Sequence, residues 1–360
     1  MSTQIVLYYT RMTEAKQSLS GDKNKVKYSV IAIFILFSLL FLVSGSFSVV
    51  SSGKKLIASV KIIISEEKNK PAFDYSPVFI NTEQKPVVSA LSYLGAYLGE
   101  NDKTIILAEK NSDDLLPMAS ITKLMTAIVA YKNYDLNDKV AIGPKVNDWT
   151  DSSKRFIPGT SFKISEMLHA LLIESNNDVA MALAGKIGMD NFLAEMNGEA
   201  KKMGIITTHY DNPVGLDPTS KKEIINYSTA KELLVLTKEI IKNYPQILEI
   251  TSIPQYNIKT DSGGYNHTAI NTDKFLSDEN EKLLCQGNPL KILGGKTGST
   301  DLAKKNLVLV MESPNEHGYL ITIILSADDN FSETKNLAKW LCESYTWPKP
   351  AENILQNGVY

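Results

Sequence analysis

Three short strings in a fixed order constrain the fold of this chain more than any other feature of its sequence. They are S-I-T-K at 120–123, S-N-N at 175–177 and K-T-G at 296–298. Serine-x-x-lysine also occurs elsewhere, for example at Ser228. Only the copy at Ser120 is followed about 55 residues later by serine-x-asparagine, and then by the chain's single K-T-G. A fold that uses the three strings together must bring distant segments to one place.

The spacing of apolar residues predicts strands at both ends of a domain and helices between them. Strands are expected at 96–99, 104–109, 290–295, 306–311 and 319–326. Apolar residues at three- and four-residue spacing predict helices at 121–131, 164–173, 178–187, 191–203, 227–244 and 332–345. Thr229 and Glu232 are spaced as a capping box, so Ser228 is assigned to a helix start rather than to a second active site. The pattern predicts an α+β fold, with an antiparallel sheet built from both ends of the domain and a central helical block.

One long apolar run, 28–50, carries no charged residue and is long enough to cross a bilayer. Roughly 20 residues at about 1.5 Å rise cover a hydrocarbon core of roughly 30 Å. Basic residues are more frequent before the run than just after it, which favours an N-terminus inside the cell. We therefore expect a single-pass signal anchor in the plasma membrane and an extracytoplasmic domain. A cleaved signal peptide, with small residues at 44–46 as the cleavage site, would instead give a secreted protein.

The chain is expected to consist of five parts. A polar stretch punctuated by prolines follows the apolar run and has too few periodic apolar residues to pack on its own, so we interpret it as a linker. The end of the chain is too short to form another domain. The parts are a cytoplasmic segment at 1–27, the signal anchor at 28–50, the linker at 51–86, the globular domain at 87–346 and a tail at 347–360.

Composition argues against nucleic-acid binding and against a metal site. Only Arg11 and Arg155 are arginines among the 38 basic residues, so the chain has no arginine-rich surface for reading nucleic acid. Cys285 and Cys342 are the only cysteines, and they could pair in an oxidising compartment or remain buried thiols. The four histidines fall in no metal-binding motif, and we expect neither a metal nor a cofactor. His169, in the middle of a predicted helix, is expected to have a core or rim role rather than a catalytic one.

Ser120 and Lys123 are the candidate nucleophile and base. Ser120 opens a predicted helix, where backbone N–H groups stabilise developing negative charge, and Lys123 lies three residues later on the same helical face. Lys123 can accept the serine proton only if burial or another cation lowers its pKa, and Lys296 is a candidate for that cation. In isolation, a capping serine and a solvated lysine would explain this string better. The two other strings favour a catalytic pair.

The second string predicts a connection between two helices. There Ser175 can relay a proton and Asn177 can hydrogen-bond a substrate amide. On local sequence alone, ordinary helix capping explains the same residues equally well.

The third string ends a predicted strand. This string consists of Lys296, Thr297 and Gly298. The ammonium group of Lys296 and the hydroxyl of Thr297 suit a carboxylate ligand. The backbone N–H of Ser299, together with that of Ser120, could form an oxyanion hole. Without the other strings, a lysine at a strand end would more often be solvated.

Longer matches around the strings point to a family. L-P-M-A-S-I-T-K-L-M-T-A contains Ser120, I-P-G-T-S-F-K-I-S-E-M-L-H-A-L-L-I-E-S-N-N-D-V-A contains Ser175, and G-G-K-T-G-S-T contains Lys296. With D-N-P-V-G-L-D at 211–217 and Y-S-T-A-K-E-L at 227–233, they resemble the D-alanyl-D-alanine carboxypeptidases, which are low-molecular-mass penicillin-binding proteins. The resemblance covers about residues 88–345. It implies the fold shared by β-lactamases and penicillin-binding proteins.

The resemblance also implies a reaction and a role for each residue. Enzymes of this family bind the D-alanyl-D-alanine end of a peptidoglycan stem peptide, acylate a serine, release the terminal D-alanine and hydrolyse the acyl-enzyme. The implied roles are Ser120 as nucleophile, Lys123 as general base, Ser175 as proton relay, Asn177 as substrate hydrogen-bonder, and Lys296 with Thr297 as the carboxylate site. Penicillins are expected to acylate Ser120 as substrate mimics.

The surroundings of K-T-G depart from the family pattern. Ala303 and Lys304 stand where members often have A-G, and no arginine follows Arg155, although many members use an arginine near the carboxylate site. Lys304 or Lys305 could replace that arginine, without its bidentate geometry. The choice of substrate is therefore the least constrained part of the expectation.

Three other functions compete with the carboxypeptidase hypothesis. A D,D-endopeptidase acting on peptidoglycan cross-links would use the same residues. A class A-like β-lactamase would need a glutamate in an E-x-x-L-N loop, which the sequence lacks. A non-catalytic penicillin sensor or wall-binding protein would not need the base and the relay.

Overall fold

The computed structural model describes residues 74–80, 85–100, 102–143, 155–217, 226–278 and 281–349. The chain divides into two units, 1–72 and 73–360, and all described residues belong to the second. The expected cytoplasmic segment, the expected signal anchor and the tail from 350 onward therefore lie outside the described residues. Among the described residues, no helix is both long enough and apolar enough to span a bilayer.

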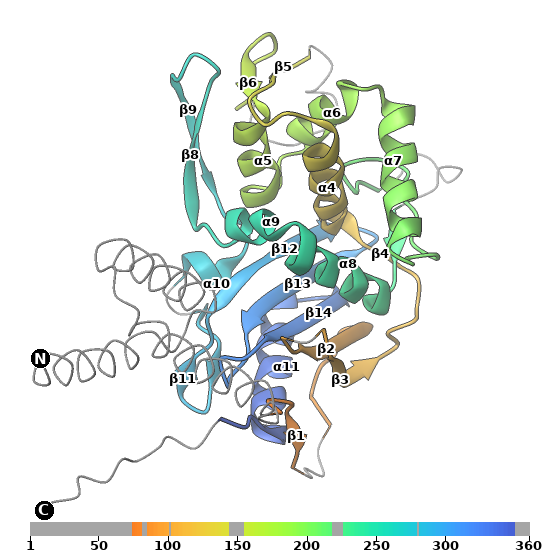
Figure 1. The fold of residues 1–360 in the computed structure, drawn as a ribbon, viewed down its shortest axis with the longest axis vertical. Helices are drawn as coiled ribbons and strands as arrows, with labels where there is room; N and C mark the ends of the chain where they lie inside the picture. The colour runs from red at the N-terminus through yellow and green to blue at the C-terminus, as the bar shows by residue number, and fades with distance from the viewer. Residues whose placement is uncertain are drawn as a thin grey trace, which may run out of the picture. The chain divides into compact units, whose positions relative to one another are not determined.

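A five-stranded antiparallel sheet, in the order β12-β13-β14-β2-β3, forms the centre of the domain (Figure 1). Its strands are β2 (Ser92–Leu98), β3 (Thr104–Lys110), β12 (Ile292–Thr300), β13 (Lys304–Glu312) and β14 (Tyr319–Ala327). β14 lies beside β2, with Tyr319 opposite Leu98, so the predicted sheet from both ends of the domain is confirmed. β2 begins four residues earlier than predicted, and all of its residues are buried.

Helices cover both faces of this sheet (Figure 1). α8 (Ala230–Asn243) and α9 (Pro245–Thr251) pack on one face, and α11 (Asn330–Ser344) packs on the other. Successive residues of β13 point to opposite faces, so Val308 joins the core with α8 and Leu307 joins the core with α11.

The predicted helical block lies between the two groups of strands in the sequence. It consists of α4 (Lys123–Asn133), α5 (Ile164–Ile173), α6 (Asn177–Gly185) and α7 (Met189–Lys202), each close to its predicted range. In α5, His169 stacks on Tyr256 with ring centroids 4.0 Å apart, and its Nδ1 lies 2.8 Å from the carbonyl oxygen of Ser165. His169 thus has the packing role that its position predicts.

The start of α8 is capped only partly as predicted. Thr229 Oγ1 accepts a hydrogen bond from the Glu232 N–H at 3.1 Å, which is one half of a capping box. The Glu232 carboxylate instead accepts from the N–H groups of Ile206 and Thr207 and from the hydroxyl of Thr208. Glu232 therefore ties α8 to the segment after α7.

Several short elements lie outside the predicted ones. The antiparallel pairs are β4 (Leu116–Pro117) with β7 (Tyr227–Ser228), β5 (Lys139–Ala141) with β6 (Ser161–Lys163), β8 (Gln255–Lys259) with β9 (Tyr265–Ile270), and β10 (Leu284–Cys285) with β11 (Asn288–Pro289). The short helix α10 (Lys274–Ser277) follows β9. Strands of two or three residues are too short to show a period of two, which is why sequence patterns miss them. The five- and six-residue strands β8 and β9 are missed although they are long enough to show it.

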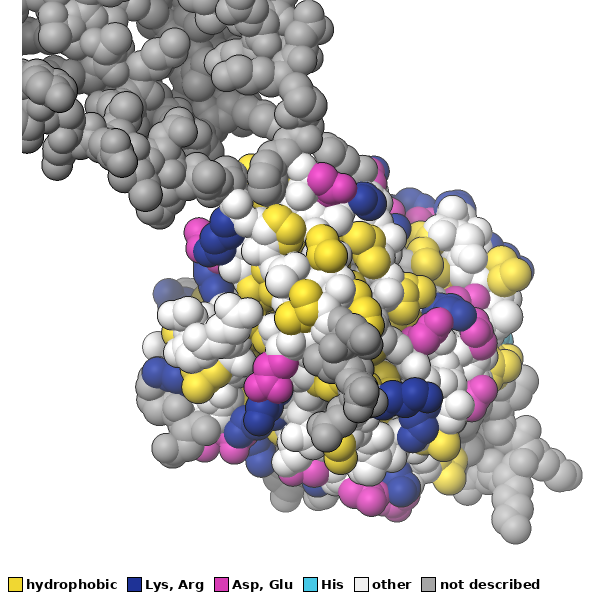
Figure 2. Space-filling model, turned by 90° about the horizontal axis from the view of Figure 1, so that it is seen from below, with side chains coloured by type: hydrophobic (Ala, Val, Ile, Leu, Met, Phe, Trp, Pro, Cys, Tyr) yellow, Lys and Arg dark blue, Asp and Glu magenta, His cyan; other side chains and the backbone are white. Residues whose placement is uncertain are grey.

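The described part of the expected linker contributes a strand. β1 (Val78–Phe79) pairs with β15 (Tyr345–Thr346), and the Ile80 N–H donates to the Ser344 carbonyl at 2.9 Å. Phe79 packs edge-on against Tyr345 with ring centroids 5.2 Å apart. The segment at 78–80 is thus joined to the end of the domain by backbone pairing. Figure 2 shows the molecule from the lower end of Figure 1, where apolar side chains gather on the surface with basic and acidic side chains around them.

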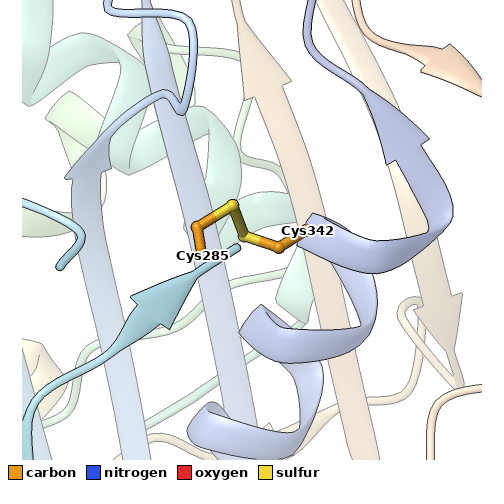
Figure 3. Close-up of a disulfide and its surroundings, with 2 residues drawn as sticks. All are labelled: Cys285 and Cys342. Carbon is orange, nitrogen blue, oxygen red and sulfur yellow. A yellow bond between two sulfur atoms is a disulfide. The ribbon is translucent and has the colours of Figure 1, made fainter. Parts of the chain in front are cut away.

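A disulfide joins Cys285 in β10 to Cys342 in α11, with Cα atoms 5.4 Å apart (Figure 3). Of the two alternatives that the sequence leaves open, the structure shows the paired cysteines. The bond fixes the segment before β12 to the helix that covers one face of the sheet.

Candidate active site

Ser120 lies in a tight turn at the start of α4. The turn is the 3₁₀ helix η1 (Ala119–Thr122), whereas we predicted that the helix begins at Ser120 itself. Residue 118 is the cap of η1 and residue 122 that of α4, so Ser120 caps neither helix. Lys123 Nζ donates a hydrogen bond to Ser120 Oγ at 2.7 Å. The capping serine and solvated lysine, our alternative explanation, are therefore not what the structure shows.

Lys123 is fully buried beneath the serine. Its side chain is 0% exposed, and its Nζ also donates to the carbonyl oxygen of Val214 at 2.8 Å. Burial lowers the pKa of Lys123 well below its ordinary value, and the positive charge of Lys296 lowers it further. Lys296 is thus the second cation that the sequence suggested, and a neutral Lys123 can accept the serine proton.

The string D-N-P-V-G-L-D at 211–217 positions this pair, a role that we did not predict. Besides the Val214 carbonyl, the Pro213 carbonyl accepts from the hydroxyl of Thr126 in α4 at 2.7 Å. Gly215 has φ +82°, and a Cβ built on it would lie 2.0 Å from the carbonyl oxygen of Ala119. Because only a glycine allows this approach, the string folds directly against the turn that carries Ser120.

The second string joins α5 to α6, as predicted. Ser175 adopts φ +62°, in the left-handed region that non-glycine residues rarely occupy. Asn176 caps α6 by accepting from the Val179 N–H at 3.0 Å, so part of the capping interpretation is also correct. Asn177, the first residue of α6, is half-buried, and its place on a substrate remains a prediction.

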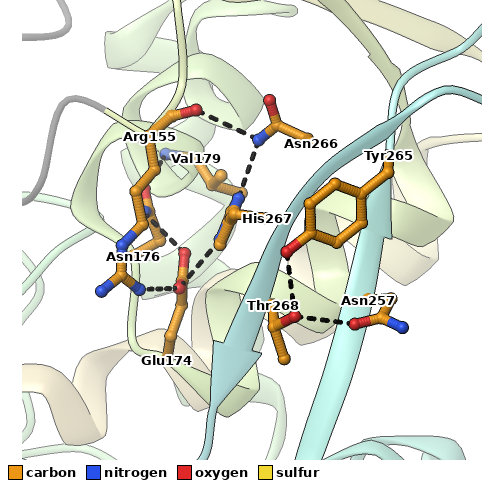
Figure 4. Close-up of polar contacts among 9 residues, drawn as sticks. All are labelled: Arg155, Glu174, Asn176, Val179, Asn257, Tyr265, Asn266, His267 and Thr268. Carbon is orange, nitrogen blue, oxygen red and sulfur yellow. Dashed lines mark hydrogen bonds and ion pairs between the residues drawn. The ribbon is translucent and has the colours of Figure 1, made fainter.

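A polar cluster supports the turn that contains Ser175 (Figure 4). Glu174 Oε2 lies 2.8 Å from the Arg155 guanidinium and 3.0 Å from His267 Nε2, and its Oε1 accepts from Asn176 at 3.0 Å. Arg155 also accepts, through its carbonyl oxygen, a hydrogen bond from Asn266. The cluster fixes α5, the second string and the β8–β9 hairpin together, and it occupies Arg155 away from the substrate cavity.

The third string lies in the middle of β12, whereas we predicted that it ends a strand. Lys296 is 1% exposed, and its Nζ donates to Ser175 Oγ and to the Thr297 carbonyl, each at 2.9 Å. A Cβ built on Gly298 would lie 2.8 Å from the Met118 carbonyl oxygen and 3.1 Å from the Ser120 nitrogen. Glycine at this position therefore lets β12 approach the nucleophile turn, and Lys296 links the third string to the second.

One cavity of about 430 Å³ opens where the three strings meet. It is lined by Ser120, Ser175, Thr272, Lys274, Thr297, Gly298, Ser299, Lys305, Asp329, Asn330 and Phe331. Of the predicted site residues, Ser120, Ser175, Thr297, Gly298 and Ser299 line the cavity, whereas Asn177 is not among the lining residues. Lys123 and Lys296 lie buried behind Ser120 and Ser175. In the described part of the chain, no group of His, Cys, Asp and Glu side chains could hold a metal ion.

The cations beside the cavity differ in part from those expected. Lys304 points to Asp328 in an exposed ion pair of 2.9 Å and is not among the lining residues, so our suggestion that it replaces an arginine is not supported. Lys305 does line the cavity. Lys274, which we did not single out, lines it as well, with its Nζ 5.4 Å from the centre of the Phe331 ring. The local sequence does not show that Lys274 lines the cavity, because this depends on the packing of α10 near α11.

Sequence comparisons identify relatives of this arrangement. A profile of the D-alanyl-D-alanine carboxypeptidases, peptidase family S11, matches residues 80–329. D-alanyl-D-alanine carboxypeptidase DacC of Escherichia coli (strain K12) is 27% identical over 309 residues, which cover 80% of this chain and 71% of DacC. DacF of Bacillus subtilis (strain 168) is 28% identical over 253 residues, which cover 68% of this chain and 60% of DacF. The chain thus spans between 60 and 71% of the length of these two relatives.

Solved structures share the fold. The D-alanyl-D-alanine carboxypeptidase of Mycobacterium tuberculosis H37Rv superposes with a TM-score of 0.60 at 26% identity, over 73% of this chain and 94% of that one. Penicillin-binding protein D2 of Listeria monocytogenes, in its ampicillin-bound form, gives a TM-score of 0.56 at 26% identity, over 71% of this chain and 98% of that one. Because the matched segment exceeds half of the chain and contains Ser120, Ser175 and Lys296, this protein belongs to the D-alanyl-D-alanine carboxypeptidase family.

Proposed function

We propose that this protein is a serine D-alanyl-D-alanine carboxypeptidase that acts through an acyl-enzyme at Ser120. The observation that carries the proposal is the 2.7 Å contact between Ser120 Oγ and a fully buried Lys123, whose pKa is lowered well below its ordinary value. A neutral amine at this distance can remove the hydroxyl proton as the oxygen attacks. The names of the relatives support peptides that end in D-alanyl-D-alanine as the substrate class, and we assign these peptides to peptidoglycan.

The side chains account for each proton in the acylation step. Ser120 Oγ attacks the carbonyl carbon between the two D-alanines while its proton passes to Lys123 Nζ. The N–H groups of Ser120 and Ser299 stabilise the oxyanion. When the C–N bond breaks, Ser175, held by Lys296, relays the proton from Lys123 to the departing D-alanine nitrogen. A water molecule then attacks the ester carbonyl and gives one proton to Lys123. When the bond to Ser120 Oγ breaks, Lys123 passes this proton to Oγ, so the serine hydroxyl is restored and the shortened peptide leaves with a new carboxyl group.

The terminal carboxylate of the substrate is assigned to the Thr297 end of the cavity. Thr297 lines the cavity, and Lys305, which also lines it, adds a positive charge. Lys296 has its Nζ bonded to Ser175 and is buried, so we assign it an electrostatic role behind the carboxylate rather than a direct contact. Asn177 is assigned to the substrate amide.

We also propose that the domain works outside the cytoplasm, attached to the plasma membrane by the apolar run at 28–50. Peptidoglycan lies there, and the disulfide between Cys285 and Cys342 suits an oxidising compartment. If the run is cleaved as a signal peptide, the same domain is secreted. Fractionation of cells, followed by sequencing of the mature N-terminus, distinguishes the two outcomes.

The test of the catalytic proposal uses the full-length chain in detergent-solubilised membranes. Fluorescent penicillin should label the wild type and the Ser332→Ala variant, which alters another serine-x-x-lysine on an exposed helix start, but not Ser120→Ala. A stem peptide ending in D-Ala-D-Ala should lose one D-alanine. Labelling of Ser120→Ala would refute the nucleophile assignment.

The same assay separates the competing functions. Cleavage of cross-linked stem-peptide dimers in preference to free D-Ala-D-Ala ends would show an endopeptidase. Rapid turnover of penicillin would show a β-lactamase. Labelling without release of D-alanine from either substrate would show a sensor.

A further inference from the structure

A buried carboxylate outside the three strings lies beside the catalytic lysines. Asp273 is 2% exposed, and its Oδ1 accepts from the Phe275 N–H at 3.0 Å, which caps α10. Its Oδ2 is buried without a hydrogen-bond partner among the described residues. Burying a charged group with an unpaired oxygen is costly, and a neutral asparagine caps a helix equally well. Capping a four-residue helix therefore does not explain a carboxylate at this position.

The chain next to Asp273 is fixed against two of the three strings. Thr297 Oγ1 donates to Thr272 Oγ1 at 2.6 Å, and Thr297 directly follows Lys296. The Thr272 N–H donates to the Ile173 carbonyl at 3.0 Å, at the end of α5 just before the second string. These bonds place Asp273 next to the strand and the turn whose side chains meet at the Lys296–Ser175 contact.

Lys296 and Asp273 compensate each other's charge. Among the described residues, Lys296 has no carboxylate within ion-pair distance, and its two hydrogen bonds go to a neutral hydroxyl and a carbonyl. Burial lowers the pKa of Lys296 to about 7 and raises the pKa of Asp273 to about 6. The attraction between the two groups opposes both of these shifts. The two charges therefore stabilise each other inside the protein.

We propose that Asp273 is a positioning residue that fixes the positive charge on Lys296 and thereby leaves Lys123 as the neutral base. The inference rests on the proposed function, in which Lys123 accepts the Ser120 proton. Lys123 and Lys296 are both buried, and a charge on Lys296 disfavours a charge on Lys123. A carboxylate that acts on Lys296 decides which lysine of the pair carries the proton.

Other charged groups around the site are directed elsewhere. Glu174, which precedes Ser175, is engaged with Arg155 and His267. Lys274 and Lys305 line the cavity as exposed cations. Asp329, at the start of α11, accepts from its own helix and has Lys305 as its neighbouring cation. Asp273 is thus the carboxylate in the described residues that acts on Lys296.

Asp273→Asn tests the proposal, since asparagine keeps the shape and the cap but removes the charge. In full-length protein labelled with ¹⁵N-lysine, the Lys296 Nζ resonance should titrate about one pH unit or more below its wild-type midpoint. The alkaline limit of penicillin acylation should fall by the same amount. Asp329→Asn removes a carboxylate from another helix cap at the same cavity, and it should leave the Lys296 midpoint unchanged.

The outcomes separate this proposal from the proposed function. An unchanged Lys296 midpoint in Asp273→Asn would overturn the charge role, even if the wild type hydrolyses its substrate. A wild type that neither reacts with penicillin nor releases D-alanine would refute the proposed function, while the Lys296 titration still decides the charge role. If Asp273→Asn does not fold, Lys296→Met gives the reciprocal measurement. The Asp273 carboxyl should then titrate about one unit higher, and an unchanged midpoint would overturn the proposal.

Discussion

Replacing Gly215 by alanine should disable the nucleophile turn, and a second glycine provides a matched control. Gly215 has φ +82°, and a Cβ built there lies 2.0 Å from the Ala119 carbonyl oxygen and 2.4 Å from its carbon. Gly263, in the β8–β9 hairpin, has φ +86° but nothing within 4 Å of the corresponding Cβ. The two positions share a positive φ, but only at Gly215 would the added Cβ collide with a neighbouring atom.

The expected effects follow from these distances. A left-handed conformation costs a non-glycine residue roughly 1–2 kcal/mol, and Gly263→Ala should lose only that. Because a carbon atom and a carbonyl oxygen cannot approach to 2.0 Å, Gly215→Ala must also move the segments by about 1 Å, which adds about 1–3 kcal/mol of overpacking. The moving segments include the Val214 carbonyl that holds Lys123 and the residue before Ser120. A misplacement of this size near reacting groups costs about 100-fold in rate.

Thermal unfolding and the rate of penicillin acylation measure the two effects separately. At roughly 2–4 °C per kcal/mol, Gly263→Ala should lower the Tm by a few degrees and leave the acylation rate at the wild-type value. Gly215→Ala should lower the Tm further and reduce the rate by about 100-fold. If Gly215→Ala matched Gly263→Ala in both Tm and rate, the close packing of 211–217 against the serine turn would not position the catalytic pair.

Three further predictions concern stability. Replacing both Cys285 and Cys342 by serine removes a cross-link between residues 57 apart in the sequence. The greater chain entropy of the unfolded state should lower the free energy of unfolding by about 4 kcal/mol. Reductant should lower the wild-type Tm to that of the double variant. The pKa of Lys296 falls from 10.5 in the unfolded chain to about 7. Between these two pH values the unfolded chain binds more protons than the folded chain. The free energy of unfolding of the wild type, relative to that of Lys296→Met, should therefore rise by up to about 1.4 kcal/mol per pH unit, as measured by denaturant unfolding from pH 7.5 to 9.5. Asp328→Ala should leave the unfolding midpoint unchanged in the same measurement, because its ion pair with Lys304 is exposed to solvent.

The elements that the sequence predicts well are those whose apolar pattern is long. α5 begins and ends at the predicted residues, and the strands β13 and β14 extend only slightly beyond their predicted ranges. β1 and β15 are two residues each and exist only because distant segments meet, so no local pattern could reveal them. The same reason explains why a segment expected to be a linker supplies a strand.

The site shows the same division between local and tertiary information. The types and order of Ser120, Lys123, Ser175 and Lys296 are visible in the sequence, and the structure brings all four together. Asp273 could not be recognised, because a carboxylate next to a four-residue helix looks like an ordinary cap until its burial is known. Polar residues acquire unusual acidity through burial and neighbouring charge, and neither is a property of the local sequence.

The basicity of Lys123 depends on the whole fold, although its position next to Ser120 is local. The lysine starts α4, its Nζ donates to the carbonyl of Val214 from the 211–217 segment, and its pKa responds to Lys296 in β12. Each contact comes from a different part of the chain, and the depressed pKa requires that all of them exclude water at once. In the unfolded chain Lys123 would be protonated at neutral pH and could not act as a base. The three strings therefore define an active site only when the sheet has assembled from both ends of the domain, which explains why their order along the chain identifies the fold better than any one string does.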